Sequence, residues 1–175
     1  MHSDNHYQKK IKFCPACGRL AQVNEWRKIV CCECGFELYF NAAAATAALI
    51  YDSEGRLLVT KRNHEPEKGF LDLPGGFVDF NENAESALRR ELLEELNLEI
   101  EQTRYFCSIP NTYIYSDIKY HTLDIFFICE PKDLSVIKHN EEIMEVLFKF
   151  PDQICAEEVG FSSMKKLLDL LKKTY

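Results

Sequence analysis

The stretch GGFVDFNENAESALRRELLEELNL, residues 75–98, decides the fold of this 175-residue chain. A Gly-Gly pair and a polar segment come first, and then Leu88, Leu92 and Leu96 recur at every fourth position. Apolar residues at that spacing share one face of a helix, so the pattern predicts an amphipathic helix over residues 83–96. Such a helix buries its leucines only if the rest of the chain supplies an apolar partner.

Three acidic residues, Glu91, Glu94 and Glu95, lie on a second face of the same predicted helix, at positions i, i+3 and i+4. Like charges at this spacing repel one another, so they are either solvated or hold a cation between them. Carboxylate oxygens suit Mg²⁺ or Mn²⁺. Taken alone, the three glutamates favour a solvated face over a metal site.

The segments on either side of this helix predict an α/β protein. Asn81 or Asn83 is the expected N-cap of the helix, because a short amide side chain accepts hydrogen bonds from its first free N–H groups. Strands and one further helix are expected elsewhere, and a turn at Asp52-Ser-Glu-Gly55 predicts that the first two strands form a hairpin. Alternating strands and helices predict a mixed sheet covered by helices. The expected strands span residues 45–51, 56–61, 100–115, 120–129 and 143–150, and the second helix spans 162–173.

Composition sets the class of protein and its compartment. The chain is 46% hydrophobic and 28% charged, with a net charge of −7, which is ordinary for a globular protein. Eight acids and two arginines within residues 75–101 account for six of the seven net negative charges. The acidic balance argues against a nucleic-acid partner. No apolar leader or membrane-length apolar run is present, so we expect a cytoplasmic protein without a membrane partner.

Five of the eight cysteines fall within the first 34 residues, and four of them form two C-x-x-C pairs, each followed by Gly. Two such pairs supply the four ligands of a closed tetrahedral Zn²⁺ site. Redox or disulfide pairs are the alternative, but a reducing cytoplasm disfavours them. Four thiolates leave no open position, so the zinc is expected to be structural, and its removal should unfold the module and change the signal of Trp26. The predicted ligands are Cys14, Cys17, Cys31 and Cys34.

The spacing within residues 76–98 resembles the box of the Nudix hydrolase family, GX5EX7REUXEEXGU with U an aliphatic residue. Gly76, Glu82 and Arg90 stand at their expected places, as do the three glutamates already named. The one departure is Asn97, where the family has Gly. That position is expected to end the helix in a left-handed conformation, which Asn tolerates next best after Gly. The preceding Leu-Pro-Gly-Gly and Arg62 also resemble the family's lead-in.

The resemblance implies a fold, a reaction and a set of site residues. The fold is an α/β/α sandwich with a mixed sheet, here preceded by a small four-Cys zinc ribbon. The reaction is metal-dependent hydrolysis of a nucleoside diphosphate linked to another moiety. Glu94 and Glu95 would be metal ligands, and Glu91 a further ligand or the base that deprotonates water. The other residues carried over are Gly75, whose carbonyl would complete the metal shell, Gly76, Arg62 at the substrate or cofactor, and Arg90 and Glu82 as orienting partners.

A further acidic residue, Glu142, resembles a late ligand or general base of several Nudix enzymes, and Glu145 is the next candidate. A solvated turn before a strand explains this segment equally well. The ribbon-plus-Nudix layout resembles NADH pyrophosphatases, but Ser108-Ile-Pro lacks the Gln-Pro-Trp of their dinucleotide motif. ADP-ribose or a nucleotide sugar is therefore as good a substrate candidate as NADH. Three nearby tyrosines are expected either to stack on the base of the nucleotide or to pack on the surface of the sheet: Tyr113, Tyr115 and Tyr120.

The expected domain order is a tail at residues 1–11, a zinc ribbon at 12–40, and a Nudix hydrolase domain with its C-terminal helix at 41–175. A second reading, from a different class, is a nucleotide-sensing Nudix module whose ribbon docks a protein or a nucleic acid. Retention of all three box glutamates favours the enzyme. Many relatives are dimers, so a homodimer stays open alongside the nucleotide-containing substrate as a partner.

Overall fold

The computed structural model describes residues 10–25 and 28–174, so most of the expected tail and Trp26 lie outside the described residues. The chain separates into two compact units, and each is described by itself. The described helices include none long and apolar enough to cross a membrane.

The N-terminal module is a small antiparallel sheet of β1 (Gln22–Glu25), β2 (Lys28–Val30) and β3 (Glu37–Tyr39), with β2 in the middle. Few of its described apolar side chains are buried: Ile29 is the one strand residue described as fully buried, and Cys14 and Cys31 are the buried cysteines. So small a core does not stabilise a fold by itself, and modules of this size rely on another constraint such as a metal.

Two sheets build the rest of the chain. β4 (Ala43–Leu49), β8 (Ile118–Pro131) and β7 (Ile100–Tyr115) form one sheet in the order β4-β8-β7. β4 pairs with β8 in parallel, and β8 follows β7 through the two-residue turn Ser116-Asp117, so this sheet is mixed. β6 (Leu71–Asp72), β5 (Leu57–Arg62) and β9 (Ile143–Lys149) form an antiparallel second sheet in the order β6-β5-β9.

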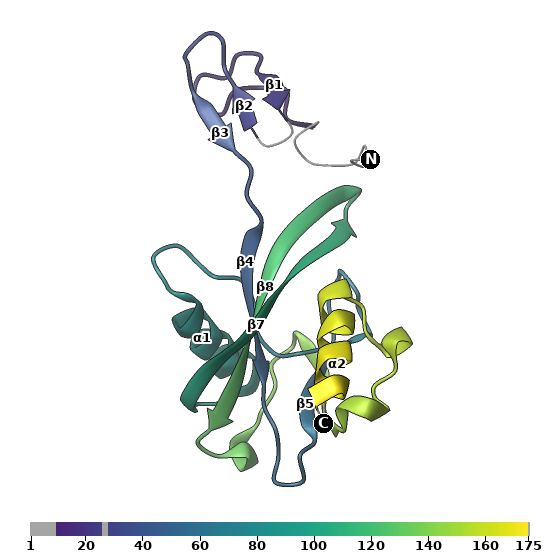
Figure 1. The fold of residues 1–175 in the computed structure, drawn as a ribbon. Coiled ribbons are helices and arrows are strands. Elements are labelled where there is room, and N and C mark those ends of the chain that lie inside the picture. The colour runs from purple at the N-terminus through teal and green to yellow at the C-terminus, as the bar shows by residue number, and fades with distance from the viewer. Residues whose placement is uncertain (1–9, 26–27, 175) are drawn as a thin grey trace. The chain divides into compact units, whose positions relative to one another are not determined.

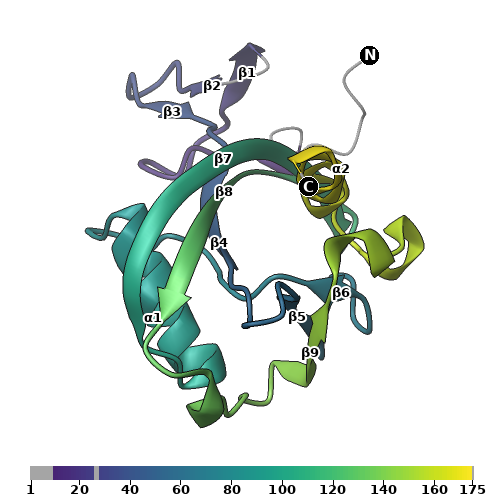
Figure 2. The same cartoon turned by 60° about the horizontal axis from the view of Figure 1, so that its bottom comes forward.

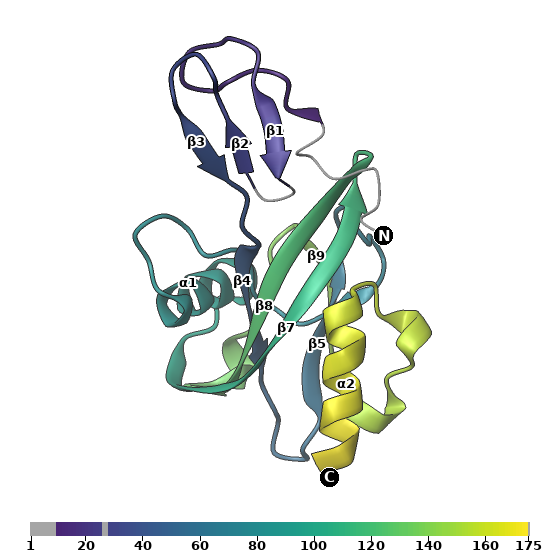
Figure 3. The ribbon, with the colours of Figure 1, turned by 45° about the horizontal axis from the view of Figure 1, so that its top comes forward.

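Helices α1 (Ala84–Leu96) and α2 (Ser162–Thr174) lie on opposite sides of β4 and β5 (Figures 1 and 3). Because side chains alternate along a strand, β4 and β5 each contribute residues to two hydrophobic cores, one on each face. Leu49 packs in the core with α2, whereas its neighbours Ala48 and Ile50 pack with α1. The predicted α/β/α sandwich with a mixed sheet is confirmed. Short 3-10 turns fill the connections at Leu134–Val136, Pro151–Gln153 and Ala156–Glu158.

The expected hairpin of the first two strands is present at its turn, where Asp52 N donates to Arg56 O at 3.0 Å, but it is short. β4 and β5 meet at the bridge between Tyr51 and Leu57 and then separate into different sheets. Beyond the bridge, β4 pairs with β8, which is far away in the sequence, and β5 pairs with β9. After β6, which pairs with β5, the chain crosses to β4, whose Ala48 N and Thr46 N donate to Pro74 O and Gly76 O. Figure 2 shows that β7 and β8 form a long, curved pair of strands.

Both ends of α1 are closed by asparagine. Asn83 is the N-cap, and its Oδ1 accepts from Ser86 N at 2.8 Å. Asn97 ends the helix in the left-handed conformation, with φ at 54°, and its N–H donates to Leu93 O at 3.0 Å. The predicted left-handed end at Asn97 is therefore confirmed, and the N-cap is the second of the two candidates.

Candidate active site

The segment Leu73–Val78 runs beside β4 and holds two glycines against it. Thr46 N donates to Gly76 O at 2.7 Å, and Ala48 N donates to Pro74 O at 2.9 Å. Gly75 lies at φ 141°, and a Cβ there would sit 2.2 Å from Thr46 O. Only glycine fits so close to the backbone of β4. The sheet therefore fixes the course of this segment as it approaches α1.

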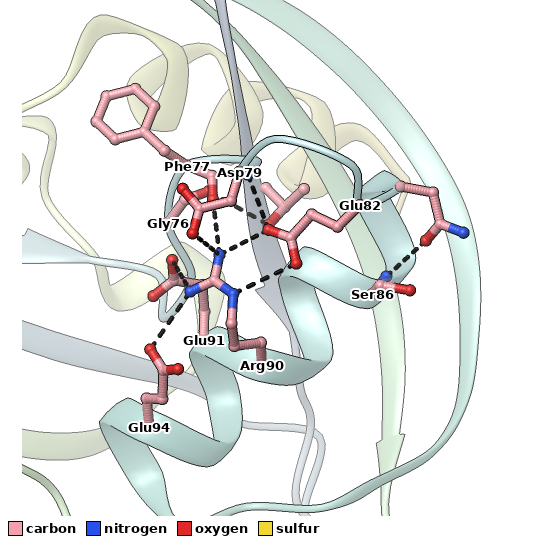
Figure 4. A network of polar contacts seen from close by, with 10 residues as sticks. Gly76, Phe77, Asp79, Glu82, Ser86, Arg90, Glu91 and Glu94 are labelled. Atoms are coloured by element: carbon pink, nitrogen blue, oxygen red, sulfur yellow. Dashed lines mark hydrogen bonds and ion pairs between the residues drawn. The ribbon is translucent and has the colours of Figure 1, made fainter.

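Arg90 is the centre of the polar network on the acidic face of α1 (Figure 4). Its guanidinium binds both carboxylate oxygens of Glu82, Nη2 to Oε1 at 2.7 Å and Nε to Oε2 at 3.3 Å. Nη1 donates to Glu91 Oε1 at 2.8 Å and to Glu94 Oε2 at 3.3 Å, and Nη2 donates to Phe77 O at 3.0 Å. These contacts raise the pKa of Arg90 and lower that of Glu82. One cation thus orients three carboxylates and the adjoining loop.

Glu91 fills the space that Gly76 leaves by having no side chain. A Cβ at Gly76 would lie 2.4 Å from Glu91 Cδ. The side chain of Glu91 is 17% exposed, and burial raises its pKa against the opposing effect of Arg90. The glycine at position 76 therefore allows the Glu91 carboxylate to lie close to the backbone.

Glu95 faces the same segment one helical turn further on. Its Oε2 accepts from Gly75 N at 3.0 Å. Burial, with smaller contributions from nearby Glu91, Asp72 and Glu142, raises the pKa of Glu95 to about 8, although the Gly75 N–H opposes the shift. A buried carboxylate among like charges binds a proton or a cation more tightly than a solvated one does.

Glu94 is the most exposed of the three, with 57% of its side chain accessible, and it turns toward Arg90. Within residues 10–25 and 28–174, the box glutamates do not converge on a single point in the way that metal ligands around one ion do. The structure therefore places them on one face beside Gly75 and Gly76, and Arg90 neutralises part of their charge.

Glu142 lies close enough to the acidic face for its charge to raise the pKa values of Glu91 and Glu95. It directly precedes β9, and its backbone is held by Asn63 N, which donates to Glu142 O at 2.9 Å. Glu145, the second candidate, is an exposed residue within β9.

The described side-chain contacts of Arg62 are not with the box glutamates, and its expected place at a substrate or cofactor stays a prediction. Its guanidinium contacts Pro66 O, Asp72 and His64. Burial raises the pKa of Asp72 to about 6 despite its pairing with Arg62. Sequence reasoning did not single out Asp72, although an acid directly before Leu-Pro-Gly-Gly was a signal that could have found it.

The four cysteines come together in the N-terminal module. Their sulfur atoms all lie within 4.8 Å of one another, and among the described residues they are the one such group of three or more potential ligands. Cys14 Sγ lies 3.7 Å from Cys34 Sγ, and Cys17 Sγ lies 3.6 Å from Cys31 Sγ. Four sulfurs about 2.3 Å from one tetrahedral ion would lie about 3.8 Å apart, so the cluster could hold zinc.

Backbone geometry explains why each cysteine pair is followed by Gly. Gly18 and Gly35 adopt φ values of 73° and 75°, which favour glycine, and each donates its N–H to the first cysteine's carbonyl of its pair. The N–H groups of Cys34 and Glu33 lower the pKa of the Cys31 thiol to about 7. All four cysteines are free thiols, and Cys32 is an exposed fifth that does not belong to the cluster.

Comparison with known proteins gives one consistent family. The NUDIX domain model matches residues 41–171. The NAD-capped RNA hydrolase NudC of Haemophilus influenzae is 32% identical over 108 residues, which cover 61% of this chain and 41% of the relative. The ADP-ribose pyrophosphatase of Methanocaldococcus jannaschii is 33% identical over 97 residues, 54% of each protein. A NUDIX hydrolase structure from Nitrosomonas europaea has the same fold, with a TM-score of 0.65, 22% identity and 91% of each chain covered.

Proposed function

Because this chain belongs to the NUDIX family, we propose that it hydrolyses the pyrophosphate bond of a nucleoside diphosphate linked to another moiety, with Mg²⁺ or Mn²⁺. The observation that carries the proposal is the acidic face of α1, where Arg90 orients Glu82, Glu91 and Glu94 and where Gly75 binds Glu95. The chain spans less than half the length of the NudC relative, so activity, substrate and partners are proposals for this protein.

The residues present fit a hard divalent cation. Carboxylate and carbonyl oxygens are the ligands that Mg²⁺ and Mn²⁺ prefer, and the proposed ligands are Glu91, Glu94, Glu95 and the carbonyl of Gly75. The missing side chain at Gly76 leaves the carboxylate of Glu91 room beside the backbone. When bound, the ions would lower the pKa of a water and neutralise the charge of the phosphates.

The chain's own residues supply orientation. The bidentate Arg90–Glu82 contact fixes the guanidinium, and that guanidinium in turn fixes Glu91 and Glu94. The Gly75 N–H holds Glu95 Oε2, so helix and loop position this carboxylate together. Glu142 stands near Glu91 and Glu95 and is the candidate that would take a proton from the attacking water, with Glu91 as the alternative.

The substrate is proposed as an NADH, ADP-ribose or nucleotide-sugar type of molecule. The relatives support this class, since one is named for NAD-capped RNA and the other for ADP-ribose. An RNA carrying an NAD cap therefore joins the candidates, although the acidic balance of the chain predicts no nucleic-acid partner. The cysteine cluster is proposed to hold a structural Zn²⁺, supported by its sulfur spacing.

The test is product release from a substrate panel of NADH, ADP-ribose, ADP-sugars, Ap4A, nucleoside triphosphates and an NAD-capped RNA. Each is incubated with the full chain and Mg²⁺ or Mn²⁺, and AMP and phosphate are measured. We expect AMP from at least one dinucleotide-like substrate and none without a divalent ion. Tight binding of one compound with no turnover of any would instead support the nucleotide-sensing module.

A further inference from the structure

The contacts of Arg62 occupy every nitrogen of its guanidinium. Nε donates to Pro66 O at 2.9 Å, Nη1 to Asp72 Oδ2 at 3.1 Å, and Nη2 lies 3.0 Å from His64 Nε2. The side chain is 17% exposed, and its charged end lies 5.0 Å from the centre of the Phe161 ring. Three of the five N–H groups of the guanidinium are thus directed at neighbouring groups, and these contacts hold the side chain in place as a structural cation.

Asp72 connects Arg62 to the segment that leads to the acidic helix, because its two carboxylate oxygens bind different partners. While Oδ2 binds Arg62, Oδ1 accepts from Leu73 N at 2.9 Å. The same segment then reaches Gly75, whose N–H donates to Glu95. A run of hydrogen bonds and peptide groups thus joins Arg62 to a box glutamate that Arg90 does not bind.

Phe161 brings the start of α2 into the same unit. The next two residues anchor that helix to the mixed sheet, with Ser162 Oγ donating to Asn111 Oδ1 at 2.9 Å and Ser163 Oγ donating to Asp124 Oδ2 at 2.5 Å. Just before Phe161, Val159 forms a parallel bridge with Leu71, the residue preceding Asp72. The ring therefore meets Arg62 from a position fixed on both sheets.

We infer that Arg62, Asp72 and Phe161 form a positioning unit that sets the course of Leu73–Gly76 and thereby the place of Glu95. The inference rests on the proposed function, since it assigns Glu95 a role in holding the metal. Arg62 in this assignment acts through Asp72 and does not touch the substrate. Partners that orient metal ligands typically change metal affinity by about 10- to 100-fold when they are removed.

The experiment compares Arg62→Lys, Asp72→Asn, the two combined, and Phe161→Leu in the full chain. Two readouts need no turnover: Mn²⁺ affinity measured by calorimetry, and amide hydrogen exchange of residues 73–76. Arg56→Lys and Asp52→Asn form the matched control, because Arg56 Nε binds Asp52 Oδ2 at 2.7 Å in the turn after β4. Thermal unfolding verifies that each variant is folded.

We expect Arg62→Lys and Asp72→Asn each to weaken Mn²⁺ binding by about tenfold or more and to speed exchange of residues 73–76. The double variant should bind Mn²⁺ no more weakly than the more affected of the two single variants, because both substitutions break the same contact. On a substrate that turns over, kcat should fall while KM stays within about twofold. Phe161→Leu should show a smaller change in the same direction, and the control pair none.

A substrate contact would give the opposite result. Arg62→Lys would then raise KM while exchange and Mn²⁺ affinity stay at parental values, and Asp72→Asn would be neutral. Either observation overturns the inference. If the parent hydrolyses nothing on the panel, the proposed function fails, yet the exchange of residues 73–76 in the single and double variants still decides whether Arg62 and Asp72 position this segment.

Discussion

The cysteine cluster and the acidic face of α1 are two groups of potential metal ligands organised in opposite ways. The four sulfurs lie within 4.8 Å of one another, brought together by two tight turns. The glutamates stay apart, and a protein cation, Arg90, binds two of them. A structural site is closed by its own ligands, whereas a catalytic site keeps room for substrate and water. The cysteines are therefore already placed around one point, whereas Glu91 and Glu94 are placed by their contacts with Arg90.

The largest expected effect is the loss of kcat when a proposed metal-binding glutamate of α1 is replaced. Glu94→Gln or Glu95→Gln should lower kcat by about a thousandfold or more, because each removes a charge from the cation site while keeping the shape of the side chain. Glu85→Gln, in the first turn of the same helix, is the matched control and should leave kcat unchanged. Steady-state rates on the best panel substrate give the answer, and activity of either variant within about threefold of the parent contradicts the assignment.

Removal of zinc should affect the cysteine cluster and leave the acidic face of α1 intact. A chelator strong enough to extract zinc should unfold the N-terminal module, because its small core cannot replace the free energy of metal binding. The NUDIX domain, with its two large cores, should remain folded. Amide exchange followed by mass spectrometry separates the two regions. Protection of residues 28–39 that survives complete loss of zinc would show that the cysteines are not a folding site.

Gly76→Ala tests how tightly the loop and the acidic helix approach each other. The backbone of Gly76 is not in the left-handed region, so Ala is tolerated there, but its Cβ would lie 2.4 Å from Glu91 Cδ. We expect the carboxylate to move and kcat to fall by about a hundredfold. The free energy of unfolding should change little, since the displaced side chain is flexible. Parental kcat in a folded variant would mean that the position of Glu91 is unimportant.

Arg90→Lys should have a smaller effect than loss of a ligand. Lysine keeps the positive charge but cannot bind both oxygens of Glu82 while also reaching Glu91. A fall of about tenfold in Mn²⁺ affinity is expected, measured by calorimetry against Arg89→Lys on the neighbouring position. Equal affinities in the two variants would show that Arg90 supplies charge alone.

Asn97→Gly should have the smallest effect. Glycine relieves the cost of about 1 kcal/mol for a left-handed residue with a Cβ. The substitution also removes the bond from Asn97 Nδ2 to Val136 O, which contributes about 1 kcal/mol. The free energy of unfolding in urea should therefore change by less than about 1 kcal/mol. A loss of twice that size would identify the amide contact, and not the backbone, as what ends α1.

Local features were predictable from the sequence because they depend on nearby residues. The leucine stripe, the cap at Asn83 and the left-handed Asn97 all follow from the chemistry within one helix. Pairing between distant strands was not predictable in this way. The turn at residues 52–55 correctly indicated a reversal, yet β4 pairs along its length with the distant β8, and the chain after β4 meets β5 at the Tyr51–Leu57 bridge.

The site was predictable to the same extent. Box spacing located the glutamates and Arg90, since three and four residues along a helix define a face. It could not show that Arg62 binds Asp72, because that contact depends on how β5, β6 and the start of α2 come together. Roles assigned to individual glutamates stay predictions until the variants are measured.

The central claim is that the acidic face of α1 cleaves a pyrophosphate bond with water. The most direct measurement is mass spectrometry of the products formed from ADP-ribose or NADH by the full chain in H₂¹⁸O with Mg²⁺. We expect one ¹⁸O in a phosphate-bearing product for each bond cleaved, and no product without a divalent ion. Bound but intact nucleotide, with no ¹⁸O incorporated under either condition, would contradict it.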